Sequence, residues 1–281
     1  MLFQSLFFCI LTINICFTIV DLMIRKTSLN VNSAQYIAQR STLTVCFTLA
    51  WMWLIDGFKI PINPKTILQM VGCALICGIG LFTFIEATKY LAFTNLLLIQ
   101  SLGPIVQQVI GKYLFNEPSN WSLQISFIIA IIGVLIQSKI PKNTKGISLA
   151  LISIISWTLG YSLMSIPLKN TEMVWSVLIV EGTILSIAII GLLIQKNAIA
   201  LIQSRIPKPV ILIAGITVIG SYMLNYTYKH FQITNIGWLN LIFLPMTVLA
   251  SQLLFKEKIS KLEIISNVLI FIAFAFYQLA A

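Results

Sequence analysis

The chain has 281 residues, of which 58% are hydrophobic and only 9% are charged, and its mean hydropathy is +0.96. A soluble domain carries roughly 25% charged residues because water covers its surface, so this composition excludes a soluble protein and predicts an all-α integral membrane protein. The formal net charge of +10 does not indicate a nucleic-acid partner, because Lys and Arg stand singly between apolar runs and form no basic stripe.

Apolar runs long enough to cross a bilayer, which needs about 20 residues in a helix, follow one another along the chain. Connections such as DGFKIPINPK and KIPKNTK carry the Pro, Asn and Lys expected of aqueous loops. The first run is predicted to be a span and not a signal peptide, because MLFQS has no positive charge and no A-x-A site follows. The sequence therefore predicts ten transmembrane helices, near residues 3–24, 34–55, 67–88, 92–115, 119–138, 147–168, 173–195, 209–229, 234–255 and 262–280.

The chain repeats itself at an offset of 140 residues. The stretch EATKYLAFTN at 86–95 returns as YTYKHFQITN at 226–235, with Lys, Thr and Asn at matching places, and Thr18 pairs with Thr158. Because apolar matches are common in any membrane protein, the polar matches carry the weight. They predict two homologous halves.

The halves, residues 1–140 and 141–281, hold five predicted spans each. Five is an odd number, so if both halves fold alike, the second enters the membrane from the opposite side. The halves are then related by a pseudo-two-fold axis in the membrane plane. Inverted repeats of this kind are typical of secondary transporters, which bind substrate near the midplane and work by alternating access.

The stretch ATKYLAFTNLLLIQSLGPIVQQVIGKYLFNE resembles the signature of EamA-type transporters in the drug/metabolite transporter superfamily, and TYKHFQITNIGWLNLIFLPMTVLASQLLFKE repeats it. The resemblance covers the whole chain and implies that the third, fourth, eighth and ninth helices line a substrate cavity. Pro245 departs from the offset, because it follows Pro104 by 141 residues. Each proline removes a helical hydrogen bond, so both are candidate bending or gating positions.

Matching residues in the two halves are candidates for substrate binding. Each half has two aromatic or acidic side chains four residues apart on one helix, where they share a face. Each half also has one amide side chain on the following helix. These candidates are Phe82, Glu86 and Gln100 in the first half and Tyr222, Tyr226 and Asn240 in the second.

Three further aromatic residues, Trp157, Tyr161 and Trp238, are added to the predicted cavity. Aromatic rings with a few amide and hydroxyl groups suit a small amphipathic organic solute. Anchoring at the headgroup level stays open for these three, and it fits Trp51, Trp53, Trp121 and Trp175 better.

Acidic residues inside predicted spans need a reason, because charge is costly in a bilayer. Glu181 lies well inside the seventh span, where it is either a coupling carboxylate or a structural acid bonded to a neighbour such as Arg40. Glu86 is the second coupling candidate. Lys89, Lys229 and His230 are candidate anion ligands. We favour a structural role for them, in which each cation lies at the C-terminal end of a helix and interacts favourably with the helix dipole.

The five cysteines lie in apolar runs, and Cys73 and Cys77 share one helix face without His or Asp beside them. They are predicted to be packing residues, and neither a metal nor another cofactor is expected. The stretch GCALICGIG at 72–80 is rich in small residues and predicts close approach of a neighbouring helix.

Lys and Arg are distributed unevenly over the predicted loops. Loops after odd-numbered spans carry twelve of them, the other side carries five, and the termini carry none. The positive-inside rule therefore places the termini outside the cytoplasm, whereas the resemblance implies cytoplasmic termini.

These observations favour a secondary transporter of small organic metabolites, amino-acid-like or amphipathic, that works by export or exchange in a plasma membrane, most simply a bacterial inner membrane. The expected partners are a small-molecule substrate and the lipid bilayer, the expected assembly is a monomer or homodimer, and enzymatic activity is not expected. A carrier of phosphorylated or nucleotide-linked solutes would need several convergent Lys or Arg. An intramembrane enzyme that acts on lipid or peptide is the alternative of another class. Proteolysis would need H-E-x-x-H or paired intramembrane aspartates, and the chain has neither.

Overall fold

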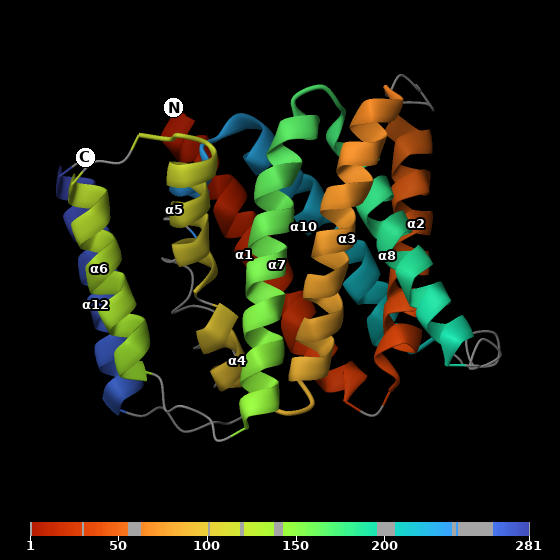
Figure 1. Cartoon of the computed structure of the whole chain (residues 1–281), viewed down its shortest axis with the longest axis horizontal. Coiled ribbons are helices and arrows are strands. Elements are labelled where there is room, and N and C mark those ends of the chain that lie inside the picture. The colour runs from red at the N-terminus through yellow and green to blue at the C-terminus, as the bar shows by residue number, and fades with distance from the viewer. Residues whose placement is uncertain are drawn as a thin grey trace.

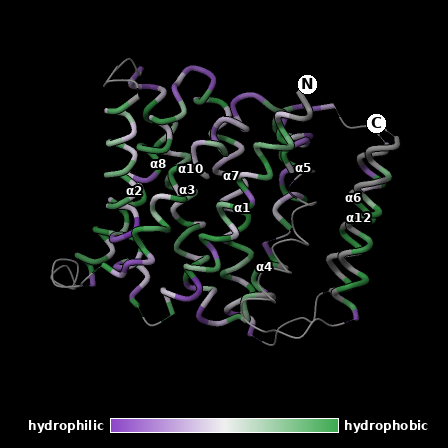
Figure 2. Tube along the Cα trace, turned by 180° about the vertical axis from the view of Figure 1, so that it is seen from behind, coloured by the Kyte–Doolittle hydropathy of each residue, from purple (hydrophilic) through white to green (hydrophobic). Residues whose placement is uncertain are grey.

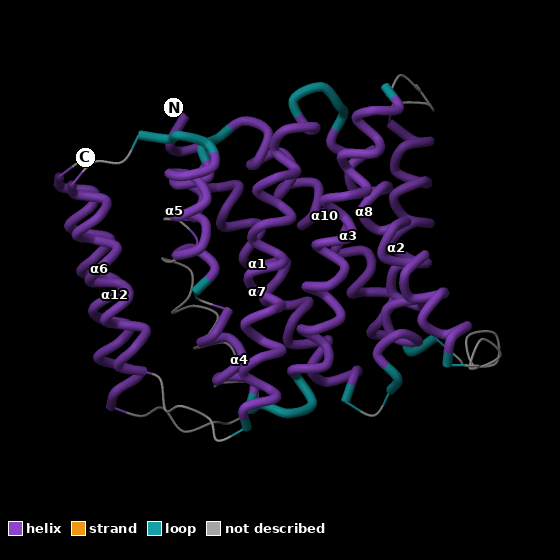
Figure 3. Tube along the Cα trace, in the orientation of Figure 1, coloured by secondary structure: helices purple, strands orange, loops and turns teal. Residues whose placement is uncertain are grey.

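The computed structural model describes residues 2–29, 31–55, 63–100, 102–118, 121–137, 143–195, 206–237, 240 and 261–280. Throughout these ranges the regular structure is α-helical and no strand occurs (Figure 3). The helices are α1 (Leu2–Ser28), α2 (Ser33–Ile55), α3 (Pro64–Ala87), α4 (Phe93–Gln100), α5 (Gly103–Leu114), α6 (Trp121–Gln137), α7 (Thr144–Leu168), α8 (Met173–Ile194), α10 (Lys208–His230) and α12 (Lys261–Ala280).

Helix lengths and hydropathy are those of a membrane protein. Among the described residues, five helical segments are long and apolar enough to cross a bilayer: Ser5–Ser28, Pro64–Ala87, Thr144–Leu168, Met173–Ile194 and Lys208–His230. Figure 2 shows hydrophobic residues along the helices and hydrophilic residues gathered toward the turns at their ends. The all-α transmembrane prediction is therefore confirmed, although most of the predicted span at 234–255 lies outside the described residues.

The two halves run in opposite directions. Helix α1 starts at the end of the molecule where the N-terminus lies, whereas its counterpart α7 starts at the opposite end (Figure 1). Equivalent helices also make equivalent contacts, since α3 packs on α7 as α10 packs on α1. Helix α2 contacts its own counterpart α8, and α6 contacts α12. A helix can touch its own repeat partner in this way near a two-fold axis, so the predicted inverted repeat is confirmed.

The fourth predicted span is two helices and not one. Helix α4 ends at Gln100 and α5 begins at Gly103, one residue before Pro104. A proline has no N–H to donate, and its ring collides with the carbonyl of the residue four positions earlier, which here is Gln100. The span therefore breaks at the point where the proline forbids the next turn.

Small residues let α3 and α7 approach closely, as the composition of 72–80 predicts. A Cβ built on Gly160 would lie 2.5 Å from the sulfur of Cys77 and 3.1 Å from the carbonyl oxygen of Cys73. A Cβ on Gly80 would lie 3.1 Å from the backbone nitrogen of Trp157. Both cysteines are free and buried, which agrees with a packing role.

Candidate functional site

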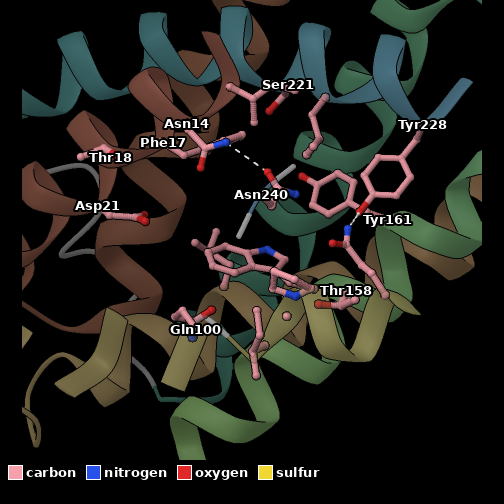
Figure 4. A pocket seen from close by; sticks show the side chains of 18 of the residues that line it. Asn14, Phe17, Thr18, Asp21, Gln100, Thr158, Tyr161, Ser221, Tyr228 and Asn240 are labelled. Atoms are coloured by element: carbon pink, nitrogen blue, oxygen red, sulfur yellow. Dashed lines mark hydrogen bonds between the residues drawn. The ribbon is translucent and has the colours of Figure 1, made fainter. Parts of the chain in front are cut away.

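A cavity of about 260 Å³ lies between the two halves. Its lining comes from α1, α2, α3, α4 and α5 of the first half, and from α7, α8, α10 and Asn240 of the second (Figure 4). Of the helices that the resemblance implicates, α3 contributes only Leu81. Helices α1 and α7 contribute most, because each turns a continuous face toward the cavity.

These two faces match residue by residue at the repeat offset. On each helix, four of the lining residues stand at i, i+3, i+4 and i+7, which is one side of an α-helix. They are Asn14, Phe17, Thr18 and Asp21 on α1, and Ile154, Trp157, Thr158 and Tyr161 on α7. The cavity therefore lies on the seam between the inverted halves.

Aromatic rings form one wall of the cavity. The ring of Trp157 lies 5.3 Å from that of Phe84, centroid to centroid, and Tyr161 stacks on Tyr228 at 6.0 Å. The side chain of Gln107 donates a hydrogen bond to the hydroxyl of Tyr228. Because these rings are held by neighbours, they offer a fixed surface to an apolar or cationic group.

Three further amide side chains provide polar groups in the cavity. Nδ2 of Asn14 donates to Oδ1 of Asn240 over 3.1 Å, which joins the first helix of one half to a residue of the other (Figure 4). Nε2 of Gln100 donates to the carbonyl oxygen of Ala150 over 3.4 Å. An amide carries donors and an acceptor, so these groups suit the orientation of a polar ligand.

A buried ion pair crosses from α2 to α8 at the edge of the cavity. The Arg40 guanidinium donates to both oxygens of Glu181, at 2.9 and 3.3 Å, and Oγ of Ser41 donates to the same carboxylate at 2.8 Å. Arg40 is 5% exposed and Glu181 is 3% exposed. These contacts match the structural role that the sequence offered for Glu181, while its part in coupling stays a prediction.

Asp21 adds a second carboxylate to the cavity. It lies one helical turn after Phe17 and Thr18, and its side chain points toward the other labelled residues in Figure 4. The side chain is half-buried. Asp21 is therefore an acidic group that a bound solute would meet.

Several of the predicted site residues meet in this cavity. Its lining includes Gln100, Trp157, Tyr161 and Asn240 of the predicted binding residues, together with Pro104 and Glu181. Trp238 and Pro245 lie outside the described residues. Gln100, Trp157, Tyr161 and Asn240 thus line the same cavity, and their role in binding substrate stays a prediction.

Four predicted binding residues do not line this cavity. Phe82 packs on the core, and Tyr222 lies against Trp51, with ring centroids 6.1 Å apart. Tyr226 packs on the His230 ring at 4.5 Å. Since successive helical residues are rotated by about 100°, the faces of α3 and α10 that carry Leu81, Ser221 and Tyr228 to the cavity turn these residues elsewhere.

The fourth of these residues, Glu86, is hydrogen-bonded to the first residue of α2. Oγ of Ser33 donates to its carboxylate, and Nζ of Lys89 lies 2.9 Å from the carboxylate and 2.8 Å from Oγ of Ser33. In the second half, Nζ of Lys229, the counterpart of Lys89, donates to the carbonyl oxygen of Thr171 over 2.8 Å. Lys89, Lys229 and His230 do not line the cavity, which agrees with the structural role favoured for them.

The sequence prediction missed the α1 residues Phe17 and Asp21, although a signal for them was present. The 140-residue offset relates Phe17 to Trp157 and Asp21 to Tyr161, both of which were candidates. Thr18 and Thr158 had already been paired by the offset. Applying the same offset to the aromatic candidates would have marked Phe17 and Asp21 beside Thr18 on α1.

Comparison with known proteins gives the following results. The sequence model of the EamA-like transporter family matches residues 4–138 and again residues 144–278. No curated protein sequence matches the chain. A solved crystal structure is similar with a TM-score of 0.73 over 99% of this chain and 98% of its own, at 14% sequence identity, which shows a shared fold.

Proposed function

The chain belongs to the EamA-like transporter family, and from that premise we propose that it carries a small amphipathic, amino-acid-like solute by alternating access, as an exporter or exchanger in a bacterial inner membrane. The family consists of transporters of small solutes, so it sets the class of activity. The substrate class that we propose depends on the size and lining of the cavity.

The observation that supports this proposal most strongly is that α1 and α7 line the cavity with matching residues. Rings from Phe17 and Trp157, hydroxyls from Thr18 and Thr158 and nearby amides surround a space of about 260 Å³. A volume of this size is near the lower end for small-molecule sites, about 300 Å³. It therefore suits a solute of amino-acid size better than a large lipid or a nucleotide sugar.

The charge of the lining argues against a phosphorylated cargo. Among the described lining residues, Arg40 is the only Lys or Arg, and its guanidinium already binds Glu181. A phosphate group is recognised best by several arginines or lysines that converge on it. The carrier of phosphorylated or nucleotide-linked solutes is thus the weaker alternative.

The test is counterflow into liposomes that contain the purified protein, with labelled amino acids and related amphipathic solutes as the panel. We expect at least one of them to exchange across the membrane, and Trp157→Ala to lower its uptake about tenfold. Trp157→Phe keeps a ring and should retain more uptake than Trp157→Ala. No exchange of any panel member would contradict the proposal.

Trp53→Ala is the matched control. Trp53 is 70% exposed on α2, where it faces away from the cavity, so its truncation removes a similar ring without changing the lining. Thermal unfolding of each variant in detergent separates lost binding from lost folding, because Trp157 also packs on Phe84.

A further inference from the structure

Asp21 breaks the symmetry of the cavity. By the repeat offset, a ring on α1 corresponds to a ring on α7 and a hydroxyl to a hydroxyl. The amide of Asn14 corresponds to the alkyl side chain of Ile154. The Asp21 carboxyl corresponds to the phenol of Tyr161. The two halves thus offer a solute similar shapes and different charges.

The other charges in the lining compensate each other. Arg40 attracts Asp21 electrostatically, but its two terminal nitrogens are bound to Glu181. No ion pair or hydrogen bond joins Asp21 to any other residue in the part of the chain that the structure describes. Of these three groups, Asp21 is therefore the acid that has no hydrogen-bonded counter-ion among the described residues.

A carboxylate within a membrane span needs a positive group or hydrogen-bond donors if it is to stay ionised. Asp21 lines the cavity and is hydrogen-bonded to no described residue, so a bound solute can supply this compensation. The rings of Phe17 and Trp157 also line this space, and aromatic faces attract cations. Carboxylate and rings together form a site for an ammonium group.

We infer that the transported solute carries a protonated amine, and that Asp21 is the residue that binds this amine and selects for it. This inference rests on the proposed function and narrows its substrate class. The amides of Gln100 and Asn240 then face the other, polar end of the solute, and the apolar body lies against Trp157.

The test compares two probes that differ only in charge, phenethylamine and 2-phenylethanol, each measured for binding to the purified full-length protein at neutral pH. We expect the wild-type protein to bind the amine at least about tenfold more tightly than the alcohol. Asp21→Asn keeps the shape of the side chain and should abolish this preference, while Asp21→Glu should keep part of it. Glu172→Gln is the control, because Glu172 is an exposed carboxylate at a helix end.

Each result decides the inference. A wild-type protein that binds the two probes equally, or binds neither, overturns it, as does an Asp21→Asn variant that still prefers the amine. If Asp21→Asn does not fold, the wild-type preference and its retention in Asp21→Glu decide instead. Counterflow of a neutral solute in liposomes, with no selection for amines, would leave the proposed transport function standing and refute only the role of Asp21.

Discussion

Ser41 and Glu181 are counterparts in the two repeats, 140 residues apart, and they are hydrogen-bonded to each other over 2.8 Å. A residue can contact its own counterpart only near the axis that relates the two halves. The Ser41–Glu181 contact therefore places the pseudo-two-fold axis between α2 and α8. Because Arg40 is the neighbour of Ser41, the buried ion pair lies beside this axis.

Removal of one partner of this ion pair should destabilise the protein strongly. Arg40→Met would leave the Glu181 carboxylate buried without its positive partner, and we expect a loss of about 3–5 kcal/mol of folding free energy. The double variant Arg40→Met, Glu181→Met should recover most of the loss, because it removes both charges. Unfolding in detergent, followed by thermal or denaturant titration, measures the effect.

Ser41→Ala is the control for this prediction. It removes one hydrogen bond to Glu181 and keeps the ion pair, so a loss of only about 1–2 kcal/mol is expected. An Arg40→Met variant as stable as the wild type would show that the pair contributes nothing, and the assignment of Glu181 to a structural role would then fail.

Sequence alone could predict the architecture because the evidence for it is distributed over many residues. The spans follow from long apolar runs, and the inverted repeat follows from the odd number of spans and the matches at one offset. Gln100 and Asn240 were also selected from this offset, whereas Trp157 and Tyr161 were selected as aromatic residues four apart on one span, and all four meet in the cavity.

The rotation of each helix could not be predicted in the same way. Phe82 and Leu81 are adjacent on α3, but only Leu81 faces the cavity, because the packing of α3 on α7 fixes which side turns inward. Both sides of a buried membrane helix are apolar, so hydropathy does not distinguish them. Asp21 was missed for a different reason, since the offset was not applied to the first helix in full.

Close packing of α3 on α7 should be sensitive to the size of one residue. Gly160→Ala would put a methyl group 2.5 Å from the Cys77 sulfur and close to the backbone of α3, so we expect a loss of about 1–3 kcal/mol by overpacking. Gly182→Ala on α8 is the control, because no atom lies within 4 Å of its added methyl group. Equal melting temperatures for the two variants would contradict the close approach.

Glu117 should stabilise a contact between the halves at the end where the termini lie. Its carboxylate accepts hydrogen bonds of 2.8 Å from the backbone N–H groups of Ile233 and Thr234, which begin the helical turn at 233–237. An acid in this position caps the turn and interacts favourably with its dipole. We expect Glu117→Gln to lower stability by about 0.5–2 kcal/mol, measured by thermal unfolding.

Asn116, the residue before Glu117, provides the control for this prediction. Asn116 has a φ of 51°, a left-handed conformation that glycine and asparagine adopt and β-branched residues avoid. Asn116→Gly should therefore be tolerated, whereas Asn116→Val should be as harmful as the loss of the cap. Tolerance of valine would mean that this turn does not position Glu117.

We expect the distribution of Lys and Arg to set the orientation in the membrane, although the family resemblance implies the opposite orientation. Both termini lie at one end of the molecule, together with the turn between α7 and α8, while the turn between α1 and α2 lies at the other end (Figure 1). Arg25 and Lys26 occupy the last turn of α1, at that other end. Positive residues favour the cytoplasmic side, so we expect the termini and the α7–α8 turn to face outward.

Single cysteines test this orientation in a variant whose five native cysteines are replaced by serine or alanine. Glu172→Cys lies in the α7–α8 turn and Leu29→Cys lies in the α1–α2 turn, and both positions are exposed. In intact cells, a thiol reagent that cannot cross the membrane should label the variant at 172 and spare the variant at 29, which should react only after the cells are broken. The reverse pattern would place the termini in the cytoplasm, as the family resemblance implies, and would show that the charge bias does not set the orientation of this chain.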